Sequence, residues 1–185
     1  MQDIFVSFIN TLVYTIEERD DYTAGHMKRV ADYAYMVAKE MRLTEEQKVD
    51  LYMASLVHDI GKIKIPLEIL VKTKNLSKIE FEFIKCHPQV GANILKQIKY
   101  FKDIPEIVLQ HHERIDGSGY PNGLKGDKIR IEAQILGIVD VYEAMISDRP
   151  YRKSLGMKIT RDELINNNGI KYNTDIINVC EKILL

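Results

Sequence analysis

The chain has 185 residues, of which 45% are hydrophobic and 29% charged, with a formal net charge of -1. Its length suits a single domain, since domains commonly run to roughly 100–200 residues, and the near-neutral charge excludes a basic field able to hold a long nucleic acid. No apolar run approaches the roughly 18 residues of a membrane helix, and no signal-peptide pattern opens the chain, so we expect a cytoplasmic protein without a membrane span.

Apolar residues at intervals of three and four predict helices along most of the chain. The first is an amphipathic helix over 1–19, and His26 opens a second after a short turn. Residues 44–47 (Thr-Glu-Glu-Gln) have the pattern of a capping box. The helix that they open is expected to end at Gly61, because glycine is a common residue just beyond a helix C-terminus.

Further helix starts are predicted in the second half of the chain. Ser77 to Glu80 and Thr160 to Glu163 repeat the capping pattern, and another helix begins near Pro105. A long helix is expected around 131–147, and Thr174 is a candidate cap for the last one.

One segment, 114–128, is rich in glycine and proline and is expected to form turns. Few segments alternate as strands do, and no repeat, low-complexity tract or linker interrupts the chain. The sequence therefore predicts an all-α fold, a compact multi-helix bundle forming one domain over 1–185 with a single Gly/Pro-rich loop.

Two pairs of adjacent ionisable residues, His58-Asp59 and His111-His112, fall near the ends of predicted helices. The C-terminal end of a helix carries partial negative charge and favours cations. Any one such residue is more often a satisfied polar group than a ligand. Adjacent pairs serve packing poorly, however, and imidazoles mixed with carboxylates suit iron, manganese, zinc or similar ions. Enough ligands for two ions, with one carboxylate able to bridge them, is typical of a two-metal hydrolase.

Three more residues have unusual surroundings. His26 stands at a predicted helix start, and His87 precedes Pro88, where a helix must kink or restart. Asp140 lies between two valines in an apolar helix, where an unpaired carboxylate would be costly.

Four strings of residues resemble the HD-GYP family. They are His58-Asp59-Ile60-Gly61-Lys62, His111-His112-Glu113-Arg114, Asp116-Gly117-Ser118-Gly119-Tyr120-Pro121 and Asp148-Arg149-Pro150-Tyr151-Arg152. This family is a branch of the HD phosphohydrolase superfamily that hydrolyses cyclic di-GMP in bacteria. The resemblance is clearest over 22–172, which is most of the chain, and its motifs are long and ordered.

The resemblance implies two divalent metal ions, with iron as the expected metal and manganese or another transition metal as alternatives. It assigns one ion to His26, His58, Asp59 and Asp140. It assigns the second to His87, His111 and His112, with Asp59 bridging the two ions and counted among the catalytic residues. Some relatives hold a third ion through a glutamate four residues before the first histidine; Tyr22 occupies that position here, which favours two ions.

The resemblance also implies roles around the metals. Lys62 would stabilise charge on the phosphoryl group. Without the resemblance, the same residue would be interpreted as a solvated lysine after a helix end. Glu143 stands where the family often has aspartate, and as a catalytic residue it would shuttle a proton. Arg149 and Arg152 resemble a cationic clamp for the second phosphate or a guanine face, while Arg149 could equally pair with Asp148.

The loop around Tyr120 has two interpretations. In the family this loop shapes the mouth of the site and contacts diguanylate-cyclase (GGDEF) domains. The resemblance therefore implies loop or partner-binding roles for Asp116, Gly117, Gly119, Tyr120 and Pro121. It also implies that Tyr120 contacts the substrate. Such a loop is also often only a packed surface turn. Asp116 is expected to organise the turn through its own backbone.

The function implied is hydrolysis of cyclic di-GMP to linear pGpG, with GMP as a further product. One alternative is an HD phosphohydrolase acting on another cyclic dinucleotide such as cyclic GMP-AMP; a mononucleotide is disfavoured by the second set of histidines and the loop. Another is a non-catalytic signalling or binding module, which should have lost metal ligands. The first helix could pair with a copy of itself in a homodimer or cap the core.

Overall fold

The computed structural model describes residues 2–17, 25–72, 75–148 and 153–185, and within these ranges it is helical, with one isolated bridge between Asn168 and Tyr172. The elements are α1 (Gln2–Glu17), α2 (His26–Glu40), α3 (Glu45–Val57), η1 (Ile60–Lys64), α4 (Leu67–Leu70), α5 (Lys78–Ile84), α6 (His87–Leu95), α7 (Ile104–Gln110), η2 (Gly126–Lys128), α8 (Ile131–Ile146), α9 (Gly156–Asn166) and α10 (Thr174–Ile183). The predicted all-α fold is confirmed. None of the helices in the described ranges has the length and apolar character needed to cross a bilayer.

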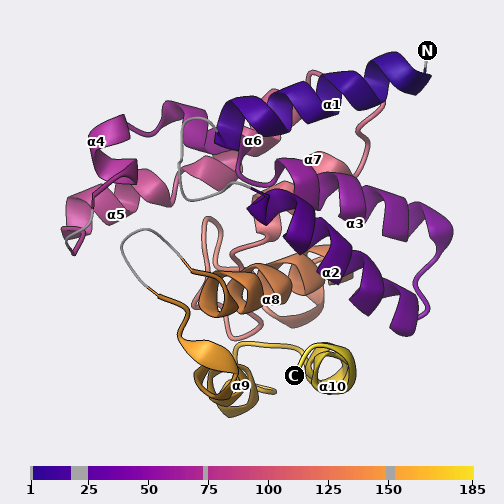
Figure 1. Cartoon of the computed structure of the whole chain (residues 1–185), viewed down its shortest axis with the longest axis vertical. Coiled ribbons are helices and arrows are strands. Elements are labelled where there is room, and N and C mark those ends of the chain that lie inside the picture. The colour runs from indigo at the N-terminus through magenta and orange to yellow at the C-terminus, as the bar shows by residue number, and fades with distance from the viewer. Residues whose placement is uncertain (1, 18–24, 73–74, 149–152) are drawn as a thin grey trace.

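The core lies where α2, α3, α7 and α8 pack against one another. One apolar stripe of α2 is buried, with Val30, Ala34, Val37 and Ala38 fully covered. The first helix contacts α3 and η1, and it buries Ile9. Figure 1 shows α1 and α6 at one end of the molecule and α9 and α10 at the other, with α8 between them.

Local start signals explain several helix ends. Two of the three predicted capping boxes form, one between Thr44 and Gln47 and one between Ser77 and Glu80. Two other predictions were wrong. Thr160 lies inside α9, where its hydroxyl donates to the Gly156 carbonyl, and Asn173 rather than Thr174 caps α10 by accepting from the Asp175 amide.

The prediction that Gly61 ends a helix was also wrong. The preceding helix α3 ends at Val57, and Gly61 lies inside the 3-10 turn η1. A Cβ atom at Gly61 would lie 2.0 Å from the carbonyl oxygen of His87. Glycine is therefore required because η1 packs backbone to backbone on the start of α6, and this contact brings the segment after α3 against the histidine that opens α6.

Candidate metal centre

Five structural elements carry the seven predicted metal ligands, and all seven converge. His26 is the first residue of α2 and His87 the first of α6, so each ring projects from a helix start. The other five stand at or beyond helix ends or within α8: His58 and Asp59 after α3, His111 and His112 after α7, and Asp140 in α8. Three groups of residues have ligand atoms within 4.8 Å of one another. The first two are His26, His58 and Asp140, and His87, His111 and His112; the third, which links them, is His58, Asp59 and His111.

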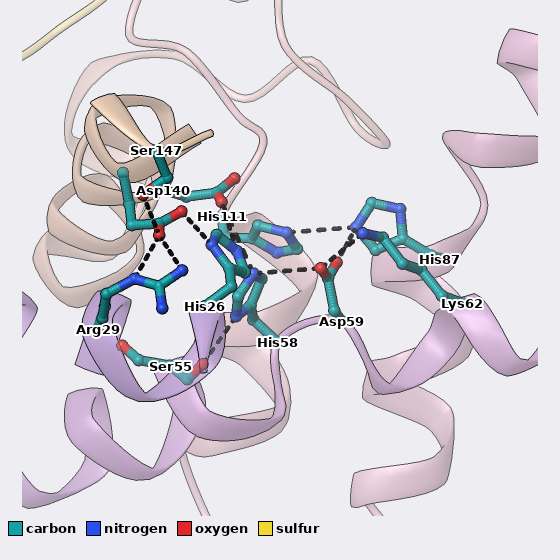
Figure 2. Close-up of polar contacts among 11 residues, drawn as sticks. His26, Arg29, Ser55, His58, Asp59, Lys62, His87, His111, Asp140 and Ser147 are labelled. Carbon is teal, nitrogen blue, oxygen red and sulfur yellow. Dashed lines mark hydrogen bonds and ion pairs between the residues drawn. The ribbon is translucent and has the colours of Figure 1, made fainter. Parts of the chain in front are cut away.

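Asp59 lies between the first two groups. Its Oδ2 is 3.6 Å from His58 Nε2, and its Oδ1 is 3.5 Å from His87 Nε2. Figure 2 shows the carboxylate directed toward both rings from the segment that follows α3. Asp59 is only 4% exposed. Its two oxygens therefore face different histidine groups, which is the placement that a bridging carboxylate needs.

Backbone carbonyls fix which nitrogen faces the site in three of the histidine rings. Nδ1 of His58, His87 and His111 lies 2.7 Å, 2.7 Å and 2.6 Å from the carbonyl oxygens of Ser55, Ile84 and Val108 respectively. Because a carbonyl only accepts, each Nδ1 must carry the hydrogen and donate it. The remaining nitrogen, Nε2, then presents a lone pair to the cluster, as a metal ligand requires.

The rings of His87 and His111 show that this site fits a cation. Their Nε2 atoms are 3.3 Å apart, and both carry lone pairs. Burial lowers the pKa of His87 to about 4 and that of His111 to about 3, so neither ring is protonated near neutral pH. Two lone pairs at this distance repel each other unless a positive charge lies between them. The donor set of imidazoles with a nearby carboxylate suits a divalent transition metal.

His26 joins the cluster to an inner network that the sequence did not reveal. Its Nε2 is 3.3 Å from Asp140 Oδ1, while its Nδ1 contacts Oε2 of Glu143. The other oxygen of Glu143 accepts from Arg29, with Nη2 at 2.6 Å, and from Ser147 at 2.7 Å. Glu143 thus lies behind His26, on the ring nitrogen away from Asp140.

These contacts shift two pKa values in opposite directions. Burial lowers the pKa of His26, but Asp140 and Glu143 more than offset it and raise the value to about 9. Burial raises the pKa of Glu143, but contacts with His26, Ser147 and Arg29 bring it down to about 2. Arg29 follows His26 by three residues and Ser147 follows Glu143 by four, so helical spacing was the only sequence signal for either.

Lys62 lies beside the bridging position. Its Nζ is 2.7 Å from Asp59 Oδ2, and its side chain remains 20% exposed. Burial raises the pKa of Asp59, but the charge of Lys62, with His58 and His87, brings it well below the ordinary value. Lys62 is therefore a cation at the edge of the cluster with part of its side chain open to solvent.

Of the predicted loop residues, Asp116 bonds within its own turn and Tyr120 contacts the histidine cluster. Asp116 Oδ1 accepts from the Ser118 amide at 2.8 Å, so this side chain organises its own turn as expected. The ring of Tyr120 instead lies against His112, with ring centroids 4.7 Å apart and an interplanar angle of 32°. Arg149, Arg152 and Tyr22 lie outside the described residues.

The family follows from comparison with known proteins. The model of the HD domain family matches residues 10–176, and the chain belongs to this family. The membership expected from the sequence motifs is thereby confirmed, and the all-helical architecture agrees with it.

Two relatives are named as bacterial cyclic dinucleotide phosphodiesterases. The chain is 39% identical over 151 residues to the cyclic di-GMP phosphodiesterase response regulator RpfG from Xanthomonas campestris, covering 80% of this chain and 40% of that protein. It is 34% identical over 140 residues to the 3'3'-cGAMP-specific phosphodiesterase 3 from Vibrio cholerae, covering 76% of this chain and 30% of that protein. The chain therefore spans less than half the length of these two curated relatives.

A solved structure supports the fold alone. An HDG"Y"P protein from Bdellovibrio bacteriovorus superposes with a TM-score of 0.71 at 22% identity, covering 86% of this chain and 51% of that one.

Proposed function

We propose that this domain hydrolyses a phosphodiester bond of cyclic di-GMP to give linear pGpG, with GMP as a further product. The observation that carries the proposal is the position of Asp59 between two histidine groups, one of which holds facing Nε2 lone pairs 3.3 Å apart. A site able to hold two cations around one carboxylate is suited to phosphodiester hydrolysis.

The metal ligands in this proposal are those that converge in the cluster. His26, His58, Asp59 and Asp140 would hold one ion, and His87, His111 and His112, with Asp59, the other. Iron is the proposed metal, with manganese as the alternative. Divalent ions held in this site would neutralise charge on a phosphate and would generate a nucleophile from water at neutral pH.

The protein's own groups have distinct roles. Lys62 places an ammonium beside Asp59, where it would neutralise charge developing on the phosphoryl oxygens. Glu143 and Arg29 hold His26 in orientation through the ring nitrogen directed away from Asp140. Arg149 and Arg152 are proposed to clamp the second phosphate or a guanine face.

The choice of cyclic di-GMP is supported by the 39% identity to RpfG. A second substrate, 3'3'-cyclic GMP-AMP, is supported by the 34% identity to the phosphodiesterase of Vibrio cholerae. We further propose action in the bacterial cytoplasm, contact with GGDEF domains through the loop at Tyr120, and a homodimer through α1.

The experiment uses protein purified without oxygen, loaded with iron or manganese, and given equal concentrations of cyclic di-GMP, 3'3'-cyclic GMP-AMP and cyclic di-AMP. Products are separated by anion-exchange chromatography. Turnover should be fastest with cyclic di-GMP and absent in Asp59→Asn, while Asp162→Asn, which alters an exposed ion pair with Lys158, is the matched control and should match the wild type.

Three results would count against this proposal. Faster turnover of 3'3'-cyclic GMP-AMP would assign that substrate instead. No turnover of any of the three would remove the proposed cyclic dinucleotide activity, and protein that binds no metal even after reconstitution would favour a non-catalytic signalling module.

A further inference from the structure

Glu113 buries a carboxylate directly after the two histidines that follow α7. It is 3% exposed, and both of its oxygens are used. Oε1 accepts from the Asn122 amide at 2.7 Å, and Oε2 accepts from the Leu124 amide at 2.9 Å. The carboxylate thus binds the backbone of the Gly/Pro-rich loop at two points, nine and eleven residues further along the chain.

The same loop touches the histidine segment through its backbone. The Tyr120 amide donates to the His112 carbonyl at 3.2 Å. A Cβ atom at Gly119 would lie 2.4 Å from both the His112 carbonyl oxygen and the Glu113 Cα. The loop therefore lies flush against residues 112–113, and a side chain at position 119 would separate them.

These contacts set the position of Tyr120. Its ring lies 4.7 Å from that of His112, which belongs to the second histidine group. Tyr120 accordingly forms a wall of the cluster on the side of His112.

We propose that Glu113 is a positioning residue that fixes loop 117–124 so that Tyr120 stays against His112 and shapes the substrate site. Only a carboxylate offers acceptors to both amides, because glutamine would place an N–H group against one of them. The anchor itself is a property of the fold, and its effect on substrate binding rests on the function proposed above.

The test compares Glu113→Gln with Glu132→Gln. Glu132 is equally buried, at 3% exposed, but its partners are Gln47 and Arg130, so it controls for the loss of a buried charge away from the loop. In Glu113→Gln, amide exchange in a peptide covering 120–126 should quicken about tenfold, as expected for one lost charge-assisted hydrogen bond. The KM for cyclic di-GMP should rise by a similar factor, while kcat and metal content stay within about twofold of the wild type. The control should change neither exchange nor KM.

A double-mutant cycle separates positioning from general destabilisation. Tyr120→Leu alone should raise KM above the wild-type value. Adding Glu113→Gln should then leave KM at the value of Tyr120→Leu, while amide exchange in the loop still becomes faster. Additive effects on KM, or loop exchange that is unchanged in Glu113→Gln, would overturn the proposal. If Glu113→Gln does not fold, Glu113→Asp provides the same comparison, because its shorter arm keeps the charge but cannot span both amides.

The two proposals fail separately. A wild-type protein that hydrolyses no cyclic dinucleotide would remove the proposed function. The exchange comparison between Glu113→Gln and Glu132→Gln would still decide whether Glu113 anchors the loop.

Discussion

The ammonium group of Lys62 lies 2.7 Å from Asp59 Oδ2, and the other oxygen of that carboxylate faces His87 at 3.5 Å. Lys62 thus balances the charge of the residue that stands between the two histidine groups. Its side chain is 20% exposed, so the same ammonium can also meet a phosphate that enters from solvent.

Replacing Lys62 by methionine should lower kcat about 10²- to 10³-fold, the usual effect of removing one group that stabilises transition-state charge. Metal content should be retained, because Lys62 is not a ligand. The measurement is steady-state hydrolysis of cyclic di-GMP with metal analysis of the same samples. Lys158→Met, which removes an exposed lysine paired with Asp162, is the control and should keep the wild-type rate. An unchanged kcat in Lys62→Met would show that the ammonium serves only Asp59.

Glu143→Gln should weaken metal binding about 10- to 100-fold, because partners that orient a metal-binding histidine have effects of this size. The glutamine keeps the shape of the side chain but loses the negative charge that faces His26 and Arg29. Isothermal titration calorimetry of the metal-free protein with manganese measures the change in metal affinity.

Ser147→Ala gives a graded comparison for the same carboxylate. It removes one hydrogen bond to Glu143 Oε1 at 2.7 Å and leaves the contacts to His26 and Arg29 in place. Its metal affinity should fall less than that of Glu143→Gln. Equal affinities in the wild type and Glu143→Gln would mean that His26 does not depend on this carboxylate.

The metal-free protein should be most stable near pH 6.5. The folded pKa of His26, about 9, is above the ordinary value, so its stabilisation is complete below pH 6.5 and is lost as the pH rises through 9. The shift corresponds to at most about 3 kcal/mol. For His87 and His111 the folded pKa is lowered, to about 4 and about 3, so their contribution is present above pH 6.5 and is lost as the pH falls toward these values.

Urea unfolding in the presence of a chelator, from pH 4.5 to pH 9.5, measures this dependence. The free energy of unfolding should decline on both sides of the maximum, and His26→Gln should remove most of the alkaline decline. A wild-type free energy that keeps rising from pH 6.5 to pH 9 would contradict the assignment of the His26 contacts.

Much of the fold, and the convergence of the candidate ligands, could be predicted because the signals are local. A capping box such as that of Thr44 and Gln47 lies within four residues, and the pairs His58-Asp59 and His111-His112 are adjacent in the sequence. The start of α9 was missed because Thr160 matches the same local pattern but is buried inside a helix that begins at Gly156.

Partners that are distant in sequence could not be predicted. Arg29 contacts Glu143 across 114 positions, and this pairing exists only once α2 packs on α8. The role of Glu113 depends on the path of the loop back to the histidine segment, which composition does not specify. Gly61 could not be interpreted from the sequence for the same reason. A glycine that ends a helix and a glycine that allows a close backbone contact cannot be distinguished without the structure.

Gly61→Ala should disrupt the metal centre although Gly61 is not itself a proposed ligand. The new methyl group would lie 2.0 Å from the His87 carbonyl oxygen and 2.6 Å from the Gly91 amide nitrogen, so η1 and α6 must move apart. Both positions are backbone atoms that cannot turn away. The free energy of unfolding should therefore fall by about 3 kcal/mol, the upper part of the range for overpacked sites, and metal binding should weaken because Asp59 and His87 lie on opposite sides of the contact.

Gly91→Ala is the matched control at the same helix contact. Its methyl group would approach side-chain atoms of Ile60 and Val108 at 3.3 Å, and these can shift by a few tenths of an ångström. Thermal unfolding and metal titration of both variants provide the measurement, and Gly91→Ala should stay much closer to the wild type in both. If the two substitutions had equal, small effects, the contact between η1 and α6 would not be what holds Asp59 against His87.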